Sequence, residues 1–270
     1  MKNRTVPLNS LLRQAATIAS LLCHRGWAER NAGNFSVRLP GKPSAFPTFP
    51  KKKIFSGTLP EALPELISDW FYVTVSGSRM RDLAVQPAES SLMVRLQKNG
   101  RDFQAFPLKG EAKQPTSELA SHLLIHCFLK KQGALKKAIL HTHPTELIAL
   151  TQIPACRNKA HLNRLLLGMY AECAMFVPKG VGLLPFMLSG GLDIAKATLA
   201  ELKEHDTVLW AKHGVLSVGR DLDDAFDSVD MVAKAADIFL KVKSSGHEPE
   251  GLSLDHIRAL ARLAAPMLLR

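Results

Sequence analysis

The stretch Lys137-Ala138-Ile139-Leu140-His141-Thr142-His143-Pro144 determines how this 270-residue chain is expected to fold. Its apolar residues predict a buried strand that ends in two histidines. Residues i and i+2 of a strand project to the same face, so we expect His141 and His143 to lie side by side. A third histidine, His213, follows a predicted strand over residues 207–210 and precedes a glycine. Three histidine ligands with one open position are typical of a catalytic zinc, so the pattern indicates a metal-dependent enzyme.

A histidine pair of this spacing is a weak signal by itself, because both side chains can also be ordinary strand residues. The chain contains a competing pair, His122 and His126, four residues apart on a predicted helix. This second pair lacks the glutamate of an H-E-x-x-H motif, and its neighbours are leucine and isoleucine. We therefore expect His122 and His126 to be packed helix residues rather than metal ligands.

Apolar residues recur with helical or strand spacing on both sides of the histidine pair. Helices are expected over residues 11–22, 117–127, 144 onward, 194–202, 222–242, and from 253 to just before Pro266. Strands are expected over residues 35–39, 71–75, 92–96, 103–106, 137–141, 173–177, 181–186 and 207–210, with Asn99-Gly100 favouring a tight hairpin. This succession predicts a single α/β domain of α+β-like character over residues 1–270, with a central, mainly antiparallel sheet flanked by helices.

One stretch, residues 40–64, does not follow this pattern. It is rich in proline and contains Lys51-Lys52-Lys53. Because a predicted strand follows at residues 71–75, we expect a long loop or a small insertion here rather than a domain boundary.

The composition limits the class of protein. With 46% hydrophobic residues the chain can bury a full core, and it contains no apolar run of the ~20 residues that a membrane span needs. Polar residues soon after Met1 argue against a signal peptide, and four scattered cysteines suggest reduced thiols in a cytoplasmic protein. The net charge of +11 favours anionic partners, such as phosphorylated metabolites, nucleic acid or membrane surfaces.

Three short polar segments could bind an anion through hydroxyls, amides or backbone N–H groups: residues 31–34, 76–78 and 116–117. Each one alone is more often just a turn or a helix cap, and Thr116 or Ser117 is the expected cap of the helix that follows. Glu118 follows the third segment, where a carboxylate favours the first turn of a helix and could also act as a general base. The chain has neither a G-x-x-x-x-G-K-[ST] nor a G-x-G-x-x-G motif for nucleotide binding, and it has no G-x-S-x-G elbow.

Taken together, five motifs resemble the class II zinc-dependent aldolases in content and order, from about residue 8 to 245. They are W-A-E-R-N-A-G-N (27–34), V-S-G-S (75–78), P-T-S-E (115–118), H-T-H-P (141–144) and H-G (213–214). The first motif and the segment from Glu172 to Pro185 are most similar to the branch that cleaves L-rhamnulose 1-phosphate.

The resemblance implies a role for each matching residue. His141, His143 and His213 would bind one Zn2+ per subunit, and Glu118 would be the acid/base residue. Glu172, which by itself looks like a surface residue, would reach the site of a neighbouring subunit in a homotetramer. The phosphate and adjacent oxygens of the dihydroxyacetone phosphate half would be held by Asn31, Gly33, Asn34, Ser76, Gly77, Thr116 and Ser117.

The expected function is that of a cytoplasmic aldehyde-lyase, acting on a phosphorylated ketose and binding neither nucleic acid nor membranes. It would cleave L-rhamnulose 1-phosphate to dihydroxyacetone phosphate and L-lactaldehyde. The alternatives are another sugar-phosphate aldolase or a 4-epimerase of the same superfamily, acting on L-fuculose 1-phosphate or ribulose 5-phosphate. A more distant alternative is a basic nucleic-acid-binding protein whose histidines are structural; its support is the +11 charge and the three lysines.

Overall fold

The computed structural model describes residues 7–44, 46, 54–111 and 113–268. Its strands are β1 (Asn34–Leu39), β2 (Phe55–Thr58), β3 (Trp70–Thr74), β4 (Ser91–Leu96), β5 (Asp102–Pro107), β6 (Ala138–Thr142), β7 (Val181–Leu184), β8 (Thr207–Trp210) and β9 (Gly214–Gly219). They form one nine-stranded sheet in the order β2-β5-β4-β3-β1-β6-β9-β8-β7. Neighbouring strands are antiparallel except β7 and β8, so the expected mainly antiparallel sheet in a single α/β domain is confirmed.

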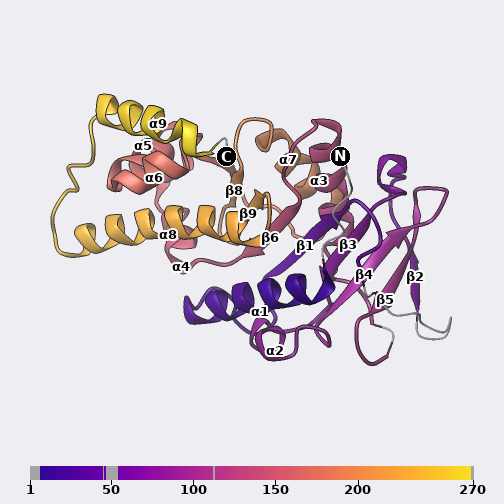
Figure 1. The fold of residues 1–270 in the computed structure, drawn as a ribbon. Coiled ribbons are helices and arrows are strands. Elements are labelled where there is room, and N and C mark those ends of the chain that lie inside the picture. The colour runs from indigo at the N-terminus through magenta and orange to yellow at the C-terminus, as the bar shows by residue number, and fades with distance from the viewer. Residues whose placement is uncertain (1–6, 45, 47–53, 112, 269–270) are drawn as a thin grey trace.

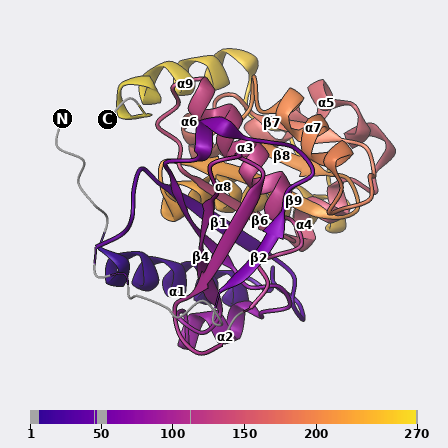
Figure 2. The ribbon, with the colours of Figure 1, turned by 90° about the vertical axis from the view of Figure 1, so that its right-hand side faces the viewer.

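Helices cover both faces of this sheet. They are α1 (Leu8–His24), α2 (Met80–Val85), α3 (Leu119–Lys131), α4 (Thr145–Leu150), α5 (Lys159–Met169), α6 (Ala171–Phe176), α7 (Leu192–Glu201), α8 (Leu222–Ser244) and α9 (Leu254–Leu268), with short 3-10 turns at Pro64–Leu66 and Pro154–Arg157. Figures 1 and 2 both show α1 and α2 below the sheet and α3 and α7 above it. A sheet covered on both faces explains why every residue of β3, β6, β8 and β9 is buried.

The strand β1 shows how the two faces differ. Phe35 and Val37 project into the core shared with α1 and α8. Asn34 and Ser36, which alternate with them, project to the opposite face and form hydrogen bonds with side chains at the start of α3. This alternation follows from the two-residue period of a strand, and it puts a polar row against one particular helix.

One predicted strand is wrong, since residues 173–177 lie mostly in α6. Cys173 and Ala174 are buried there, and α6 packs against α5, α8 and α9. A short apolar run fits a buried helix as well as a buried strand, so the pattern alone could not decide between them. The last helix also differs from its prediction, because α9 runs through Pro266 instead of stopping before it.

The proline-rich stretch at residues 40–64 is only partly a loop. It contains β2, which pairs with β5 and forms one edge of the sheet. Leu59 and Leu63 follow the strand and are buried. The three lysines, Lys51-Lys52-Lys53, lie outside the described residues.

Candidate functional site

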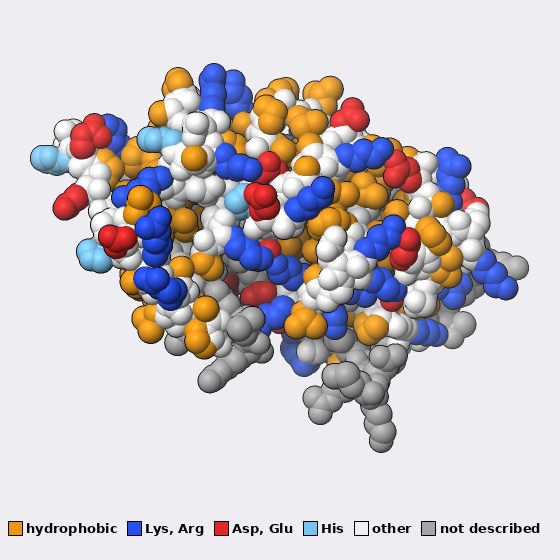
Figure 3. Space-filling view, turned by 90° about the horizontal axis from the view of Figure 1, so that it is seen from above, with side chains coloured by type: hydrophobic (Ala, Val, Ile, Leu, Met, Phe, Trp, Pro, Cys, Tyr) orange, Lys and Arg blue, Asp and Glu red, His pale blue; other side chains and the backbone are white. Residues whose placement is uncertain are grey.

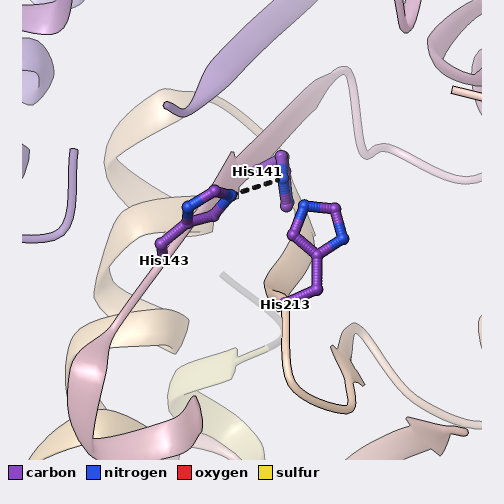
Figure 4. A group of neighbouring side chains, drawn as sticks. All are labelled: His141, His143 and His213. Atoms are coloured by element: carbon purple, nitrogen blue, oxygen red, sulfur yellow. Dashed lines mark hydrogen bonds between the residues drawn. The ribbon is translucent and has the colours of Figure 1, made fainter. Parts of the chain in front are cut away.

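The side chains of three histidines converge, as Figure 4 shows. His141 lies in β6, His143 follows the end of that strand, and His213 precedes β9, which pairs with β6. One ring nitrogen of each histidine lies within 4.8 Å of the others, and each pair of ring centroids is 5.0 Å apart. Within the described ranges, this is the one group of three or more His, Cys, Asp or Glu residues spaced closely enough to hold a metal ion.

Gly214 allows this convergence. A Cβ atom at this position would lie 2.5 Å from the carbonyl oxygen of Thr142 and 2.8 Å from Cδ2 of His143. The turn before it includes Lys212, whose φ of 62° lies in the left-handed region. The backbone N–H of Lys212 donates to Oγ1 of Thr151 at 2.9 Å and thereby fixes the turn that carries His213.

The hydrogen bonds of His141 and His143 use the Nδ1 atoms and leave the Nε2 atoms, which face each other, without a proton. Nδ1 of His141 donates to the carbonyl oxygen of Val215 at 3.0 Å, and Nδ1 of His143 donates to Oε1 of Glu29 at 2.8 Å. In the neutral rings, Nε2 of both residues then carries a lone pair, although these two atoms are only 3.2 Å apart. A cation between them would turn this repulsion into two coordinate bonds, so the donor set fits a divalent metal.

Burial keeps His141 and His213 in the neutral form that a metal requires. It lowers the pKa of His141 well below the ordinary value, and the neighbouring His143 and His213 lower it further. Burial and then His143 also lower the pKa of His213. Neutral imidazoles are the ligand form, so His141, His143 and His213 could hold a transition-metal ion at neutral pH.

A cavity of about 180 Å³ opens in front of the three histidines. Besides them, it is lined by Asn31, Ala32, Gly33, Asn34, Val75, Ser76, Gly77, Ser78, Thr116, Ser117 and Glu118. All three polar segments noted in the sequence therefore border the same cavity as the candidate acid/base residue. No lysine or arginine is among these lining residues.

Backbone pairing brings the distant segments together. The N–H of Ser76 donates to the carbonyl of Gln114 at 2.9 Å, and the N–H of Thr116 donates to the carbonyl of Thr74 at 2.9 Å. On the other side, Asn34 pairs with His141 in the register of β1 and β6. The sheet, rather than any single loop, thus determines the shape of the cavity.

Glu118 is buried at the edge of this cavity and occupies the N-cap position of α3. The prediction had Thr116 or Ser117 as the cap; in the structure the Thr116 hydroxyl accepts a 3.4 Å hydrogen bond from the N–H of Glu118. One carboxylate oxygen of Glu118, Oε2, accepts a hydrogen bond from Nδ2 of Asn34 at 3.0 Å. The carboxylate is therefore held in place while bordering the cavity.

Glu172 does not lie with the other candidate residues. It is exposed on α6 and borders a separate hollow of about 300 Å³, together with Trp27, Tyr170 and Asp230. It is not among the residues that line the cavity that Glu118 borders. Its assignment to the site of a neighbouring subunit stays a prediction.

Two parts of the site were missed in the sequence. Glu29 lies in the W-A-E-R-N-A-G-N motif but received no role, since nothing local indicates that it reaches His143. His122 and His126 are fully buried, and their shared partner is the Ser36 hydroxyl, at 2.7 and 2.8 Å. The expectation that His122 and His126 are packed helix residues is confirmed, and the Ser36 side chain that they share belongs to β1.

Charges on the surface do not gather into one block on the face seen in Figure 3. Lysine and arginine side chains there are interspersed with acidic and apolar ones. A nucleic-acid interface would need a continuous basic stripe, which this face lacks. Among the helices that the structure describes, none has the length and apolar character to cross a membrane.

Several known proteins are similar to this chain in sequence. Residues 13–240 match the family described as Class II Aldolase and Adducin N-terminal domain. Rhamnulose-1-phosphate aldolase from Bacteroides thetaiotaomicron is 35% identical over 254 residues, which cover 93% of this chain and 92% of that protein. The protein of the same name from Yersinia pseudotuberculosis is 35% identical over 244 residues, or 88% and 87% of the two chains.

Solved structures of related proteins have a similar fold. A sugar-phosphate aldolase from Thermotoga maritima has a TM-score of 0.74 and 31% identity, over 90% of this chain and 98% of that one. An L-fuculose 1-phosphate aldolase has a TM-score of 0.62 at 18% identity, over 94% and 95% of the two chains, and so shares the fold.

Proposed function

Because the chain belongs to the class II aldolase and adducin N-terminal domain family and is an aldehyde-lyase, we propose that it is the zinc-dependent aldolase of L-rhamnulose 1-phosphate. Its products would be dihydroxyacetone phosphate and L-lactaldehyde. The observation that carries this proposal is one cavity bordered by three convergent histidines, a buried glutamate and three anion-binding segments. The 35% identity to two rhamnulose-1-phosphate aldolases supports the choice of sugar.

The metal centre of the proposal consists of His141, His143 and His213. When bound there, zinc supplies Lewis-acid stabilisation of the negative charge that develops on the ketone oxygen as the C3–C4 bond breaks. Neutral histidine ligands leave the full charge of the ion available for this purpose. Glu29 and the carbonyl of Val215 orient two of the rings, so the ligand nitrogens are already aligned before substrate arrives.

Proton transfer is assigned to two glutamates. In the aldol direction Glu118 removes a proton from the carbon of dihydroxyacetone phosphate that will form the new bond, and in cleavage it returns that proton. Glu172 of a neighbouring subunit protonates the aldehyde oxygen, or accepts the hydroxyl proton in cleavage. This second role requires a homotetramer in which α6 of one subunit reaches the cavity of the next.

The phosphate of the substrate is assigned to Asn31, Gly33, Asn34, Ser76, Gly77, Thr116 and Ser117. None of these is a cation, so hydroxyls and backbone N–H groups would hold the phosphate. The net charge of +11 would instead attract the dianion from a distance, which explains a basic protein with an uncharged phosphate site. We assign the enzyme to the cytoplasm, where phosphorylated sugars and reduced cysteines coexist.

A related sugar phosphate is the second candidate. The relative from Thermotoga maritima is described as a sugar-phosphate aldolase without a named sugar, so it supports the reaction class alone. An L-fuculose 1-phosphate aldolase or a 4-epimerase of ribulose 5-phosphate would use the same metal and phosphate groups.

The experiment is a substrate panel with metal control. Release of dihydroxyacetone phosphate from L-rhamnulose 1-phosphate and L-fuculose 1-phosphate, and epimerisation of ribulose 5-phosphate, are measured before chelation, after chelation and after adding zinc back. The proposal expects release from L-rhamnulose 1-phosphate that chelation abolishes and zinc restores. Zinc-loaded protein that cleaves only another sugar phosphate would overturn the substrate assignment, and chelator-resistant cleavage would overturn the metal assignment.

A further inference from the structure

A line of hydrogen bonds runs from the Glu118 carboxylate into the core between β1 and α3. Nδ2 of Asn34 donates to Glu118 at 3.0 Å, and Oδ1 of the same amide lies 2.6 Å from Nε2 of His122. Nδ1 of His122 lies 2.7 Å from the Ser36 hydroxyl, which lies 2.8 Å from Nε2 of His126. Ser36, His122 and His126 are fully buried, and none of them borders the cavity.

The direction of every bond in this line follows from the carboxylate at its end. A carboxylate only accepts, so the Asn34 amide must turn its NH2 group to Glu118 and its oxygen to His122. His122 must then donate from Nε2, and because it is neutral its Nδ1 is an acceptor. Burial supports neutrality, since it lowers the pKa of His122 to about 4, although Glu118 opposes that shift. Ser36 donates to His122 and accepts from Nε2 of His126.

We propose that Ser36, His122 and His126 are positioning residues that fix the amide orientation of Asn34 and, through it, the Glu118 carboxylate. The inference rests on the proposed function, in which Glu118 moves the substrate proton. The Ser36 hydroxyl donates to Nδ1 of His122 and so stabilises the Nε2–H form, which the carboxylate end of the line also requires. Without it His122 can carry its proton on Nδ1; the Asn34 amide would then rotate and present its oxygen to the carboxylate.

The orientation of the Asn34 amide also gives the two carboxylate oxygens of Glu118 different roles. Oε2 accepts from Asn34 whether the carboxyl group is charged or protonated, because the amide can only donate there. The other oxygen, Oε1, is therefore the one that takes up and returns the substrate proton.

The first test reads the tautomers directly and needs no substrate. In the zinc-loaded enzyme with 15N-labelled histidine, long-range 1H–15N spectra identify which ring nitrogen carries the proton, and His122→Gln and His126→Gln assign the signals. We expect both residues as neutral Nε2–H forms in the wild type, and His122 partly or wholly as Nδ1–H in Ser36→Ala. His122 protonated on Nδ1 in the wild type would overturn the proposal.

The second test separates positioning from stability. Ser36→Ala is compared with Ser217→Ala, which removes another fully buried hydroxyl of the same sheet, bonded to Thr207 at 3.0 Å and outside the line. Both variants are expected to lose similar thermal stability. Only Ser36→Ala should lose kcat, by roughly 10- to 100-fold, since supporting hydrogen bonds of this kind carry about that weight.

Two further readouts use the same variants. Exchange of dihydroxyacetone phosphate hydrogen with deuterium oxide reports the Glu118 step alone, and it should fall in parallel with kcat. In a His122→Gln background, Ser36→Ala should cost little more, because the glutamine amide donates to Asn34 without a tautomer to control. Full kcat in Ser36→Ala, or the same loss in Ser217→Ala, would overturn the positioning role.

Failure of the proposed function gives a different result. A wild-type enzyme that neither cleaves L-rhamnulose 1-phosphate nor exchanges dihydroxyacetone phosphate hydrogen would reject the assignment of Glu118. The tautomers of His122 and His126 are measured on that same protein without substrate, so the hydrogen-bond line is judged separately.

Discussion

Glu29 Oε1 accepts a 2.8 Å hydrogen bond from Nδ1 of His143, linking the turn before β1 to the end of β6. The Glu29 side chain is 64% exposed, whereas that of His143 is only 16% exposed. Although partial burial opposes it, the hydrogen bond to His143 lowers the pKa of Glu29. A carboxylate in this position keeps Nε2 of His143 directed at the metal site and makes it a stronger donor.

Glu29→Gln should therefore weaken metal binding while leaving the fold intact. We expect zinc affinity to fall roughly 10- to 100-fold, the usual effect of removing a carboxylate behind a histidine ligand. Competition with a chromophoric chelator measures the affinity. Glu204→Gln, an exposed glutamate after α7, is the matched control, and equal affinities in the two variants would refute the role of Glu29.

Glu172 gives a prediction about assembly. If it serves a neighbouring subunit, a tetramer containing inactive Glu118→Gln and inactive Glu172→Gln subunits must contain some complete sites. In a four-fold ring mixed one to one at random, about a quarter of the sites combine Glu118 from one subunit with Glu172 from the next. Unfolding the two variants together and refolding them should restore about that fraction of wild-type kcat, and no gain over the separate variants would show that Glu172 does not act across subunits.

The free energy of unfolding should fall as the pH is lowered, over a range set by the buried histidines. The pKa of His122 is about 4 in the folded state, below the ordinary 6.5, so the unfolded chain takes up the proton first as pH falls. The contribution of a neutral His122 is fully present above about pH 6.5 and is lost progressively down to about pH 4, at a cost of about 3 kcal/mol. His126 and His141 act in the same direction, since burial lowers the pKa of both.

Urea unfolding at fixed protein concentration between pH 7 and 4.5 tests this expectation. The free energy of unfolding should fall more steeply for the wild type than for His122→Gln, which has no proton to take up. Carboxylates titrate in both proteins and cancel in the difference. Parallel curves would contradict a buried neutral His122.

Gly214 should tolerate no side chain. In Gly214→Ala the new methyl group would meet the carbonyl oxygen of Thr142 at 2.5 Å, and a backbone atom cannot rotate away. We expect a loss of about 1–3 kcal/mol of unfolding free energy, together with weaker zinc binding as β6 and β9 separate. Gly191→Ala, where a Cβ meets nothing within 4 Å, is the control; equal stability and zinc content in the two variants would argue against this close approach.

The regular part of the fold could be predicted from the sequence because its apolar periods are long. The stripe over residues 11–22 became α1, and the hairpin at Asn99-Gly100 joins β4 to β5. Short elements such as α2 and β9 carry too few periods to be distinguished from turns. The strand β2 was missed for another reason, since it has only four residues and lies in a proline-rich stretch, although no proline falls within the strand itself.

The candidate site divides in the same way. Eleven of the twelve candidate residues border one cavity, and they come from motifs whose local chemistry is visible in the sequence. Glu29, Ser36 and His122 act through partners that are distant along the chain, and no local pattern gives the register that joins them. Glu172 borders another hollow, so the role proposed for it requires a neighbouring subunit.

The polar row between β1 and α3 depends on how far the strand and the helix each advance along their axes. Two residues of an antiparallel strand advance about 6.8 Å, and four residues of a helix advance about 6 Å. The mismatch is small enough for Asn34 and Ser36 to meet His122 and His126 directly. One step further, Arg38 and Lys130 are both cations, and they share the carboxylate of Asp69 at 3.4 and 2.8 Å.

This match in spacing restricts the number of residues in β1. An insertion or deletion of one residue between positions 34 and 38 would turn every following side chain to the opposite face of the sheet. The residues on the apolar face of β1 can therefore vary, but the number of residues in the strand must match the spacing of side chains along α3.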